Sequence, residues 1–271
     1  MRRTWLSWAG STVIAAGACA AELPPVSSPQ PPAASRVNFV GYLNASTLPN
    51  SALLVPPPPA SGSAALARDE ELSREGLALH GSPRWDLAAQ DAALAFPAIV
   101  ETFSCALDAS ISEERTPHLM SLLRKTLVDA GRSTSAAKKR YQRVRPFMTN
   151  DKPICTPQSE EVLRSDGSYP SGHSAIGYAF GLVLSEIAPE QADALLARGR
   201  AFGQSRIVCN VHWASDVAEG QLMGAAVVAR LHAEPEFRAD VDAARAELAA
   251  LRLQPSAPVR DCKLEATTLE E

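Results

Sequence analysis

The sequence DGSYPSGHSAIGYAFG, residues 166 to 181, passes from a turn-forming cluster directly into an apolar helical pattern. Serine, glycine and proline all favour the start of a helix, so the stretch predicts a helix over residues 171–188. Capping accounts for Ser171 and Gly172, but it does not account for His173 at the same junction. The histidine raises the question of whether this helix N-terminus has a second use.

Helical patterns also dominate the chain from Ser63 onward. Apolar residues recur three and four positions apart in long segments, and Gly131 supplies a stop for one of them. The expected helices cover 65–79, 84–103, 118–131, 135–145, 171–188, 190–205, 212–232 and 235–252. No stretch shows convincing strand alternation. The sequence therefore predicts an all-α, single-domain helical bundle over residues 63–255, followed by a C-terminal tail, 256–271.

Two of the expected helices carry glycines four residues apart, Gly177 with Gly181 and Gly220 with Gly224. Small residues at this spacing let helices approach closely, and they also occur in membrane-spanning helices. Charged residues in both helices and their short apolar lengths argue against membrane spans. The glycines are therefore expected in the core of the bundle.

Composition and charge exclude some classes of partner. The chain has 271 residues, of which 46% are apolar and 21% charged, as is ordinary for a soluble globular protein. The formal net charge of −4 gives no general attraction to nucleic acid or to anionic membranes. Nucleic acid is therefore not an expected partner.

The first twenty residues predict a secretory signal peptide. Arg2 and Arg3 supply the positive region, residues 5–17 are mostly apolar, and residues 18–20 read ACA, an A-x-A cleavage site. The apolar stretch is too short for a permanent transmembrane helix. The start faintly resembles a twin-arginine signal, and Cys19 lies in a weak lipoprotein-type site without the usual large aliphatic residue. Export is expected, with a lipid anchor the less favoured outcome.

Residues 21–62 form a leader rich in proline, serine and alanine. Proline at this density excludes helix and favours extended polyproline II conformation. The leader is expected to be partly disordered, whereas residues 38–55 carry enough apolar side chains to lie along the surface of the main domain.

Four cysteines remain after the signal peptide: Cys105, Cys155, Cys209 and Cys262. An even number in an exported chain indicates disulfides, and four cysteines allow three pairings. Chain proximity favours Cys105–Cys155 and Cys209–Cys262. No two of them have the short spacing of metal ligands, so no metal site is expected.

Two further segments carry candidate functional residues. In KKRYQRVRP, Lys138 and Arg145 are seven positions apart, so on one helix they project from the same face; a solvated basic face is the alternative. In SRIVCNVHWASD, His212 and Asp216 are four apart. A carboxylate at that spacing can orient the imidazole by binding one ring nitrogen. Arg206 adds a planar cation suited to phosphate oxygens.

The three segments together resemble a known signature. They are Lys138-x6-Arg145-Pro146, then Pro170-Ser171-Gly172-His173, then Ser205-Arg206-x5-His212-x3-Asp216. This order is similar to the three-part motif of the type 2 phosphatidic acid phosphatase superfamily, which also includes vanadium haloperoxidases. The segments DGSYPSGH, LLVPPPPASGS and TPHL further resemble the bacterial class A non-specific acid phosphatases. The resemblance spans about residues 40–245, and Ser174 departs from it where threonine is expected.

The resemblance implies an exported acid phosphatase domain that hydrolyses a broad range of phosphate monoesters through a phosphohistidine intermediate. It implies an acidic pH optimum, inhibition by vanadate, no metal or other cofactor, a periplasmic or secreted location and a homo-oligomer. It makes His212 the nucleophile, Asp216 its orienting carboxylate and His173 the proton donor. The residues expected to bind phosphate are Lys138, Arg145, Ser171, Gly172 and Arg206. A helix N-terminus with Gly172 offers backbone N–H groups to an anion.

Three other functions use related residues. A lipid phosphatase usually carries several membrane spans, and a vanadium haloperoxidase would bind vanadate in the same cage. An exported phosphate-binding protein would need the cage but neither histidine. The sequence favours the phosphatase over all three. The remaining histidines, His80, His118 and His232, are expected to pack or to lie at the surface, Trp213 to pack, and Tyr169 is a candidate for the mouth of the site.

Overall fold

The computed structural model describes residues 40–253, 257–258 and 260–270 of the chain. Their longer helices are α2 (Ala64–Ala78), α3 (Pro83–Gln90), α6 (Pro117–Ser133), α10 (Gly172–Ile187), α11 (Ala192–Val208), α12 (Ala214–Leu231), α13 (Pro235–Leu253) and α14 (Cys262–Leu269). Short helices are α1 (Ser51–Leu54), α4 (Ala98–Glu101), α5 (Ser104–Leu107), α7 (Ser135–Tyr141), α8 (Pro146–Asn150) and α9 (Glu160–Arg164). No strand occurs among the described residues, and the predicted all-α class is confirmed.

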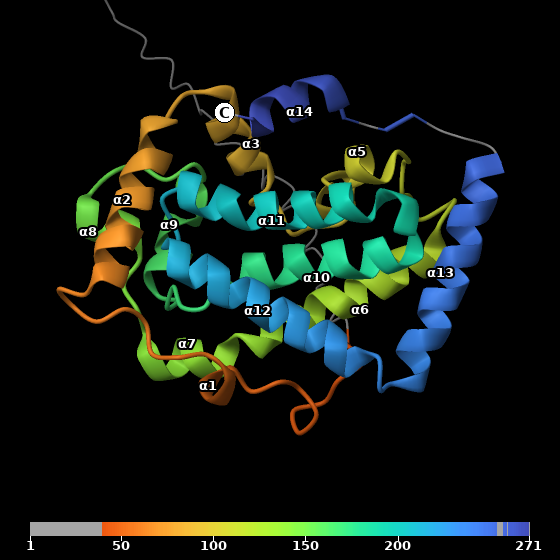
Figure 1. The fold of residues 1–271 in the computed structure, drawn as a ribbon, viewed down its shortest axis with the longest axis horizontal. Helices are drawn as coiled ribbons and strands as arrows, with labels where there is room; N and C mark the ends of the chain where they lie inside the picture. Colours follow the sequence, from red (N-terminus) through yellow and green to blue (C-terminus); the bar gives the residue numbers. More distant parts are fainter. Residues whose placement is uncertain (1–39, 254–256, 259, 271) are drawn as a thin grey trace, which may run out of the picture. The chain divides into compact units, whose positions relative to one another are not determined.

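Helix α10 is the central element, with α6, α11 and α12 packed around it (Figure 1). Its sequence explains this position, because apolar residues occupy every face and Ile176, Phe180 and Leu184 are almost fully buried. The helix begins at Gly172, where the Ser171 side chain caps it by accepting from the Ser174 amide. A helix that is apolar all round belongs in a core, so its N-terminus is held rigidly from several sides.

Glycines let the backbones of these helices meet. A Cβ on Gly199 would lie 2.7 Å from the Gly177 carbonyl oxygen on α10, and one on Gly181 would lie 2.9 Å from the Leu195 oxygen on α11. A Cβ on Gly220 of α12 would collide with the Ser171 carbonyl oxygen. The glycine spacing thus serves close packing within the bundle, as the sequence predicted. No helix of the described residues is long and apolar enough to cross a membrane.

Two expected helices end earlier than their apolar patterns suggested. The segment 84–103 contains α3, a connection over 91–97 and the short α4, which has Pro97 at its N-cap. Proline within the segment is incompatible with one continuous helix. The segment 135–145 is helical only to Tyr141, after which Gln142 has a left-handed backbone (φ 43°). Arg145 precedes Pro146, is extended, and caps α8, as expected for a residue before proline. Lys138 and Arg145 therefore do not share a helix face.

The described part of the leader is packed against the bundle. The amides of Tyr42 and Leu43 donate to the buried Asp129 carboxylate of α6, and α1 contacts α7. For the described residues 40–55 this agrees with the expectation that residues 38–55 lie along the main domain. The predicted signal peptide, Cys19 and leader residues up to 39 lie outside the described residues.

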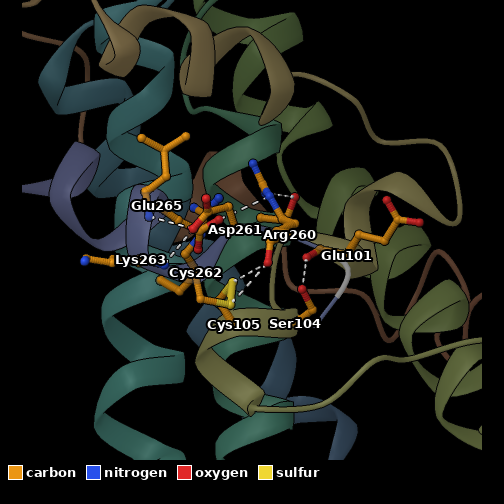
Figure 2. The surroundings of a disulfide bond; sticks show 11 residues. Glu101, Ser104, Cys105, Arg260, Asp261, Cys262, Lys263 and Glu265 are labelled. Carbon is orange, nitrogen blue, oxygen red and sulfur yellow. Dashed lines mark hydrogen bonds and ion pairs between the residues drawn. A yellow bond between two sulfur atoms is a disulfide. The ribbon is translucent and has the colours of Figure 1, made fainter. Parts of the chain in front are cut away.

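The cysteine pairing differs from the one favoured by chain proximity. The disulfides are Cys105–Cys262 and Cys155–Cys209, with Cα atoms 5.3 and 4.8 Å apart. Proximity along the chain failed because folding brings α14 beside α3 and α5, far from it in sequence. Figure 2 shows Cys262 at the start of α14 joined to Cys105 of α5, with Arg260 and Glu265 beside the bond. The expected C-terminal tail thus contains a helix that is covalently held.

Candidate active site

The three motif segments meet at the N-termini of α10 and α12. The Ser171 amide, at the start of α10, donates to the Asp216 carbonyl oxygen in the first turn of α12 (2.9 Å). The Ser168 amide donates to the Arg143 carbonyl oxygen (2.9 Å), which connects the basic segment to the residues before α10. These backbone contacts place side chains that are far apart in sequence around one buried position.

His212 is held from both ring nitrogens. Its Nε2 lies 3.1 Å from Arg145 Nη1, and its Nδ1 lies 3.3 Å from Asp216 Oδ2. Because a guanidinium only donates, Nε2 must accept and the proton must reside on Nδ1, from which it is donated to Asp216. His212 precedes α12, and Asp216 also accepts from the Trp213 amide in a capping box (2.9 Å). The predicted His212–Asp216 contact is present, through a helix cap and not along a helix face.

Burial sets the protonation of this pair. Burial, followed by the nearby cations Arg145, Lys138 and Arg206, lowers the pKa of His212 well below its ordinary value. Burial raises the pKa of Asp216, whereas Arg143 and the Trp213 amide oppose that shift. His212 is therefore neutral in the resting site, with an unprotonated Nε2.

Two buried arginines, Arg145 and Arg206, and the partly exposed Lys138 lie around His212. The Arg145 and Arg206 side chains are only 1% and 2% exposed as residues. Burial and Arg145 lower the pKa of Lys138. They also lower the pKa of Arg206 to about 10, so Arg206 remains charged near neutral pH. Arg206 Nε is buried and has no hydrogen-bond partner among the described residues. An excess of buried, incompletely paired positive charge favours the binding of an anion.

Asp166 occupies part of this cationic cradle. Its Oδ2 lies 2.6 Å from Lys138 Nζ and 3.2 Å from Arg145 Nη2, while its side chain is 51% exposed. The Asp166 backbone carbonyl also accepts from Arg145 Nε (3.0 Å). A half-exposed carboxylate on two phosphate-binding candidates is positioned like the anion that the cradle would receive.

His173 lies beside the same cations on the first turn of α10. Its Nε2 is 3.0 Å from the Ala92 carbonyl oxygen, so Nε2 carries a proton and Nδ1 is the unprotonated nitrogen of the neutral ring. The ring stacks on Phe202 with centroids 6.2 Å apart. Burial, followed by Arg206, lowers the pKa of His173. A negatively charged ligand among these cations would oppose that shift.

The structure also assigns the residues outside the motifs. His80 packs on Trp85, His232 pairs with Glu186 (3.2 Å), and the His118 amide donates to Glu247 (2.9 Å). Tyr169 is 1% exposed and its hydroxyl donates to the Pro56 carbonyl oxygen, so it does not line an open mouth. Trp213 packs, with its Nε1 donating to the Val144 carbonyl oxygen.

Sequence reasoning missed Arg143, Asp69, Ser215 and Asp166. Arg143 lies within the basic segment, where nothing distinguishes it from its charged neighbours, and Asp69 is one acidic residue on an amphipathic helix. Asp69 is buried and the Arg143 side chain is 9% exposed. Arg143 donates to Asp216 and to Asp69, which connects both residues to the site. No group of three or more histidine, cysteine, aspartate or glutamate residues in the described part of the chain is arranged to hold a metal ion.

The PAP2 superfamily model matches residues 118–238, which contain all three motif segments. The chain belongs to the PAP2 superfamily, and the resemblance read from the motifs is confirmed.

Curated relatives cover most of the chain. The chain is 40% identical over 206 residues to the acid phosphatase of Zymomonas mobilis, and this match covers 76% of the chain and 78% of the relative. It is 43% identical over 200 residues to the non-specific acid phosphatase of Salmonella typhimurium, covering 73% of this chain and 80% of the relative. It is 41% identical over 212 residues to the non-specific acid phosphatase of Providencia stuartii, covering 78% and 86%.

Proposed function

We propose that this chain is an acid phosphatase that hydrolyses phosphate monoesters through a phosphohistidine on His212. The observation that carries the proposal is the His212 ring, held with an unprotonated Nε2 among the cations Arg145, Lys138 and Arg206. Names of the relatives support the reaction class. The phosphoryl group would bind Lys138, Arg145 and Arg206, together with the Ser171 hydroxyl and the backbone N–H group of Gly172 at the α10 N-terminus.

In the first step the His212 Nε2 lone pair attacks phosphorus in line, and the bond from phosphorus to the alkoxide oxygen breaks. Asp216 accepts the Nδ1–H hydrogen bond and stabilises the positive charge that the ring acquires. The buried cations stabilise the equatorial oxygens, so positioning and charge supply the catalysis. In the second step water attacks phosphorus, His212 leaves as a neutral ring, and inorganic phosphate is released.

His173 would protonate the departing alkoxide and then accept a proton from the attacking water. Its Nε2–H is engaged with the Ala92 carbonyl oxygen, so the transferred proton belongs on Nδ1. Because burial and Arg206 lower the pKa of His173, this proton is present only at acidic pH or once the ester's charge is bound. A phosphate monoester has a second pKa of about 6, and its monoanion can bring the proton into the site. Both routes favour an acidic optimum.

Hydrolysis of p-nitrophenyl phosphate across pH 4 to 8, with EDTA present, tests the proposal. Turnover should be highest on the acidic side, blocked by orthovanadate and unaffected by the chelator. His212→Ala should lose on the order of 10⁴-fold or more in kcat, as expected for removal of a nucleophile, while remaining folded. Rapid acid-free quenching of a radiolabelled substrate should trap phosphate on wild-type His212.

Substantial turnover by His212→Ala would contradict the assignment of the nucleophile. Wild-type protein that binds phosphate without turnover would contradict the assignment of phosphatase activity. An assay of bromide oxidation with vanadate and peroxide would then distinguish a haloperoxidase from a phosphate-binding protein. Export to the periplasm or medium and a broad substrate range are further parts of this proposal. Cell fractionation and a panel of nucleotide, sugar and aryl phosphates test them.

A further inference from the structure

A buried arginine lies between two buried carboxylates behind His212. Arg143 Nη1 is 2.6 Å from Asp216 Oδ1, and Arg143 Nη2 is 2.7 Å from Asp69 Oδ2. The side chains of Arg143, Asp69 and Asp216 are 9%, 3% and 0% exposed. Burial of three charges is costly unless each is paired. Here each charge is paired, and a paired buried network of this kind is weak evidence for a purely stabilising role. Its contact with Asp216 points to a role in the site.

Asp69 fixes the far side of Arg143. Its Oδ1 accepts from the Ser215 amide (2.8 Å) and its Oδ2 from the Ser215 hydroxyl (2.6 Å). The same hydroxyl accepts from Arg143 Nη1 (2.7 Å). Helix α2, the segment after α7 and the first turn of α12 are thereby joined in one hydrogen-bonded ring. The guanidinium has no freedom to turn away from Asp216.

The two oxygens of Asp216 have separate partners. Oδ2 accepts from His212 Nδ1 and the Trp213 amide, whereas Oδ1 accepts from Arg143. Arg143 therefore does not compete with His212 for the carboxylate. It fixes the plane of the carboxylate and so directs Oδ2 at the ring.

We propose that Arg143 is a positioning residue for phosphoryl transfer, which keeps Asp216 ionised and its Oδ2 directed at His212. Among the described residues, the side-chain hydrogen bonds of Arg143 go to Ser215, Asp216 and Asp69 and not to the cradle cations. Its guanidinium also lies over the Tyr169 and Trp213 rings. Its hydrogen-bonded link to His212 runs through Asp216, and the inference rests on the phosphatase proposed above.

The cations around Asp216 favour its ionised form, whereas burial and the nearby Asp69 carboxylate oppose it. The charged and titratable groups around it are Asp69 on α2, Lys138 on α7, Arg143 and Arg145 after α7, Tyr169 before α10 and His212 before α12. Burial raises the pKa of Asp216, and Arg143 is the largest of the influences that lower it. Without Arg143 the carboxyl would take up a proton at higher pH. A protonated Asp216 can no longer stabilise the charge on a phosphorylated ring.

The test replaces Arg143 and follows kcat and KM from pH 4 to 8. In Arg143→Met and Arg143→Gln the acidic limb of the kcat profile should move at least one unit toward neutral pH. The loss relative to wild type should then grow about tenfold for each unit below the new limb, with KM changed by less than threefold. Arg143→Lys should fall between, because an ammonium keeps the charge but cannot bridge two carboxylates.

A matched control is Arg124→Met. Arg124 is also an ion-paired arginine over an aromatic ring, but its partners are Glu113 and Phe96, outside the site. Arg124→Met should lower the thermal stability, as the Arg143 variants do, but the pH dependence of its kcat should be the same as in the wild type.

A second readout does not depend on turnover. In resting wild-type protein, ¹⁵N shifts of His212 should report a neutral ring protonated on Nδ1 throughout pH 5 to 8. In the neutral Arg143 variants these shifts should change at the pH where the displaced limb falls.

The outcomes separate this inference from the proposed function. If the wild-type protein shows no turnover, or if His212→Ala is active, the proposed phosphatase mechanism is wrong. The ¹⁵N titration would still show whether Arg143 holds Asp216 ionised. Folded Arg143 variants whose kcat falls equally at every pH, with unchanged His212 titration, would overturn the positioning role. If the neutral variants do not fold, Arg143→Lys decides: a displaced limb supports the role and an unchanged profile contradicts it.

Discussion

Replacing Asp166 by asparagine should tighten the binding of phosphate. The Asp166 carboxylate pairs with Lys138 (2.6 Å) and Arg145 (3.2 Å), the residues proposed to hold the phosphoryl group. A ligand anion must displace it from both. Asparagine removes the charge but retains the backbone carbonyl that accepts from Arg145 Nε, so the cradle should keep its shape.

The size of the effect follows from exposure. Contacts of a half-exposed carboxylate with cations contribute about 1 kcal/mol in total, which corresponds to about fivefold in affinity. The inhibition constant of inorganic phosphate should therefore fall about five- to tenfold in Asp166→Asn, since repulsion between the carboxylate and the ligand also disappears. The KM for p-nitrophenyl phosphate should fall in parallel. The change in kcat should be smaller than threefold.

Competition assays and calorimetric titration with phosphate, at pH 5 and at two salt concentrations, measure the change. Glu160→Gln is the matched control, because Glu160 is an acidic residue on α9 that pairs with Arg164 instead of the cradle. It should alter phosphate affinity by less than twofold. Weaker or unchanged phosphate binding in Asp166→Asn would refute the reasoning, since it would show that the carboxylate helps to build the cradle and does not compete for it.

Two further predictions concern the bundle. Joint replacement of Cys105 and Cys262 by serine should lower the free energy of unfolding by about 2–5 kcal/mol, because this bond joins residues 157 positions apart; thermal denaturation measures it, and a non-reducing peptide map with Cys105 bound to Cys155 would contradict the pairing. Burial raises the pKa of Asp129 to about 6, so the folded protein holds this proton more tightly than the unfolded chain does. The free energy of unfolding should therefore decrease as the pH rises from about 4 to about 6. In Asp129→Asn that part of the slope should vanish, and urea titrations that show the same slope would contradict it.

The local sequence pattern was sufficient to predict the all-α fold class and to single out the three motif segments that meet at the N-termini of α10 and α12. Apolar spacing predicted the long helices, and the cap at Ser171 and the four-residue glycine spacing both serve the packing expected of them. Such features depend on interactions within a few residues of the chain, which a sequence displays directly. The His212–Asp216 contact was also predictable, because four residues separate its members.

Local pattern failed where a backbone turn interrupts an apolar repeat. Residues 84–103 and 135–145 keep a helical spacing of apolar residues, yet α3 ends at Gln90 before a connection that contains Pro97, and α7 ends at Tyr141 before the left-handed Gln142. Arg145 is an extended residue at the N-cap position of α8. The left-handed turn at Gln142 separates it from Lys138, so the two side chains approach the site from different segments.

Only the tertiary structure decided which distant residues complete the site. Asp69 reaches Arg143 across 74 positions and Ser215 across 146, and each cysteine pairs with a partner that chain proximity did not favour. The sequence by itself determined the all-α class, the basic residues of the three motifs and the histidine with its carboxylate, because each depends on short-range spacing along the chain. The ion pairs that set the charge of that carboxylate depend on how α2, α10 and α12 pack, and that packing is a property of the whole bundle.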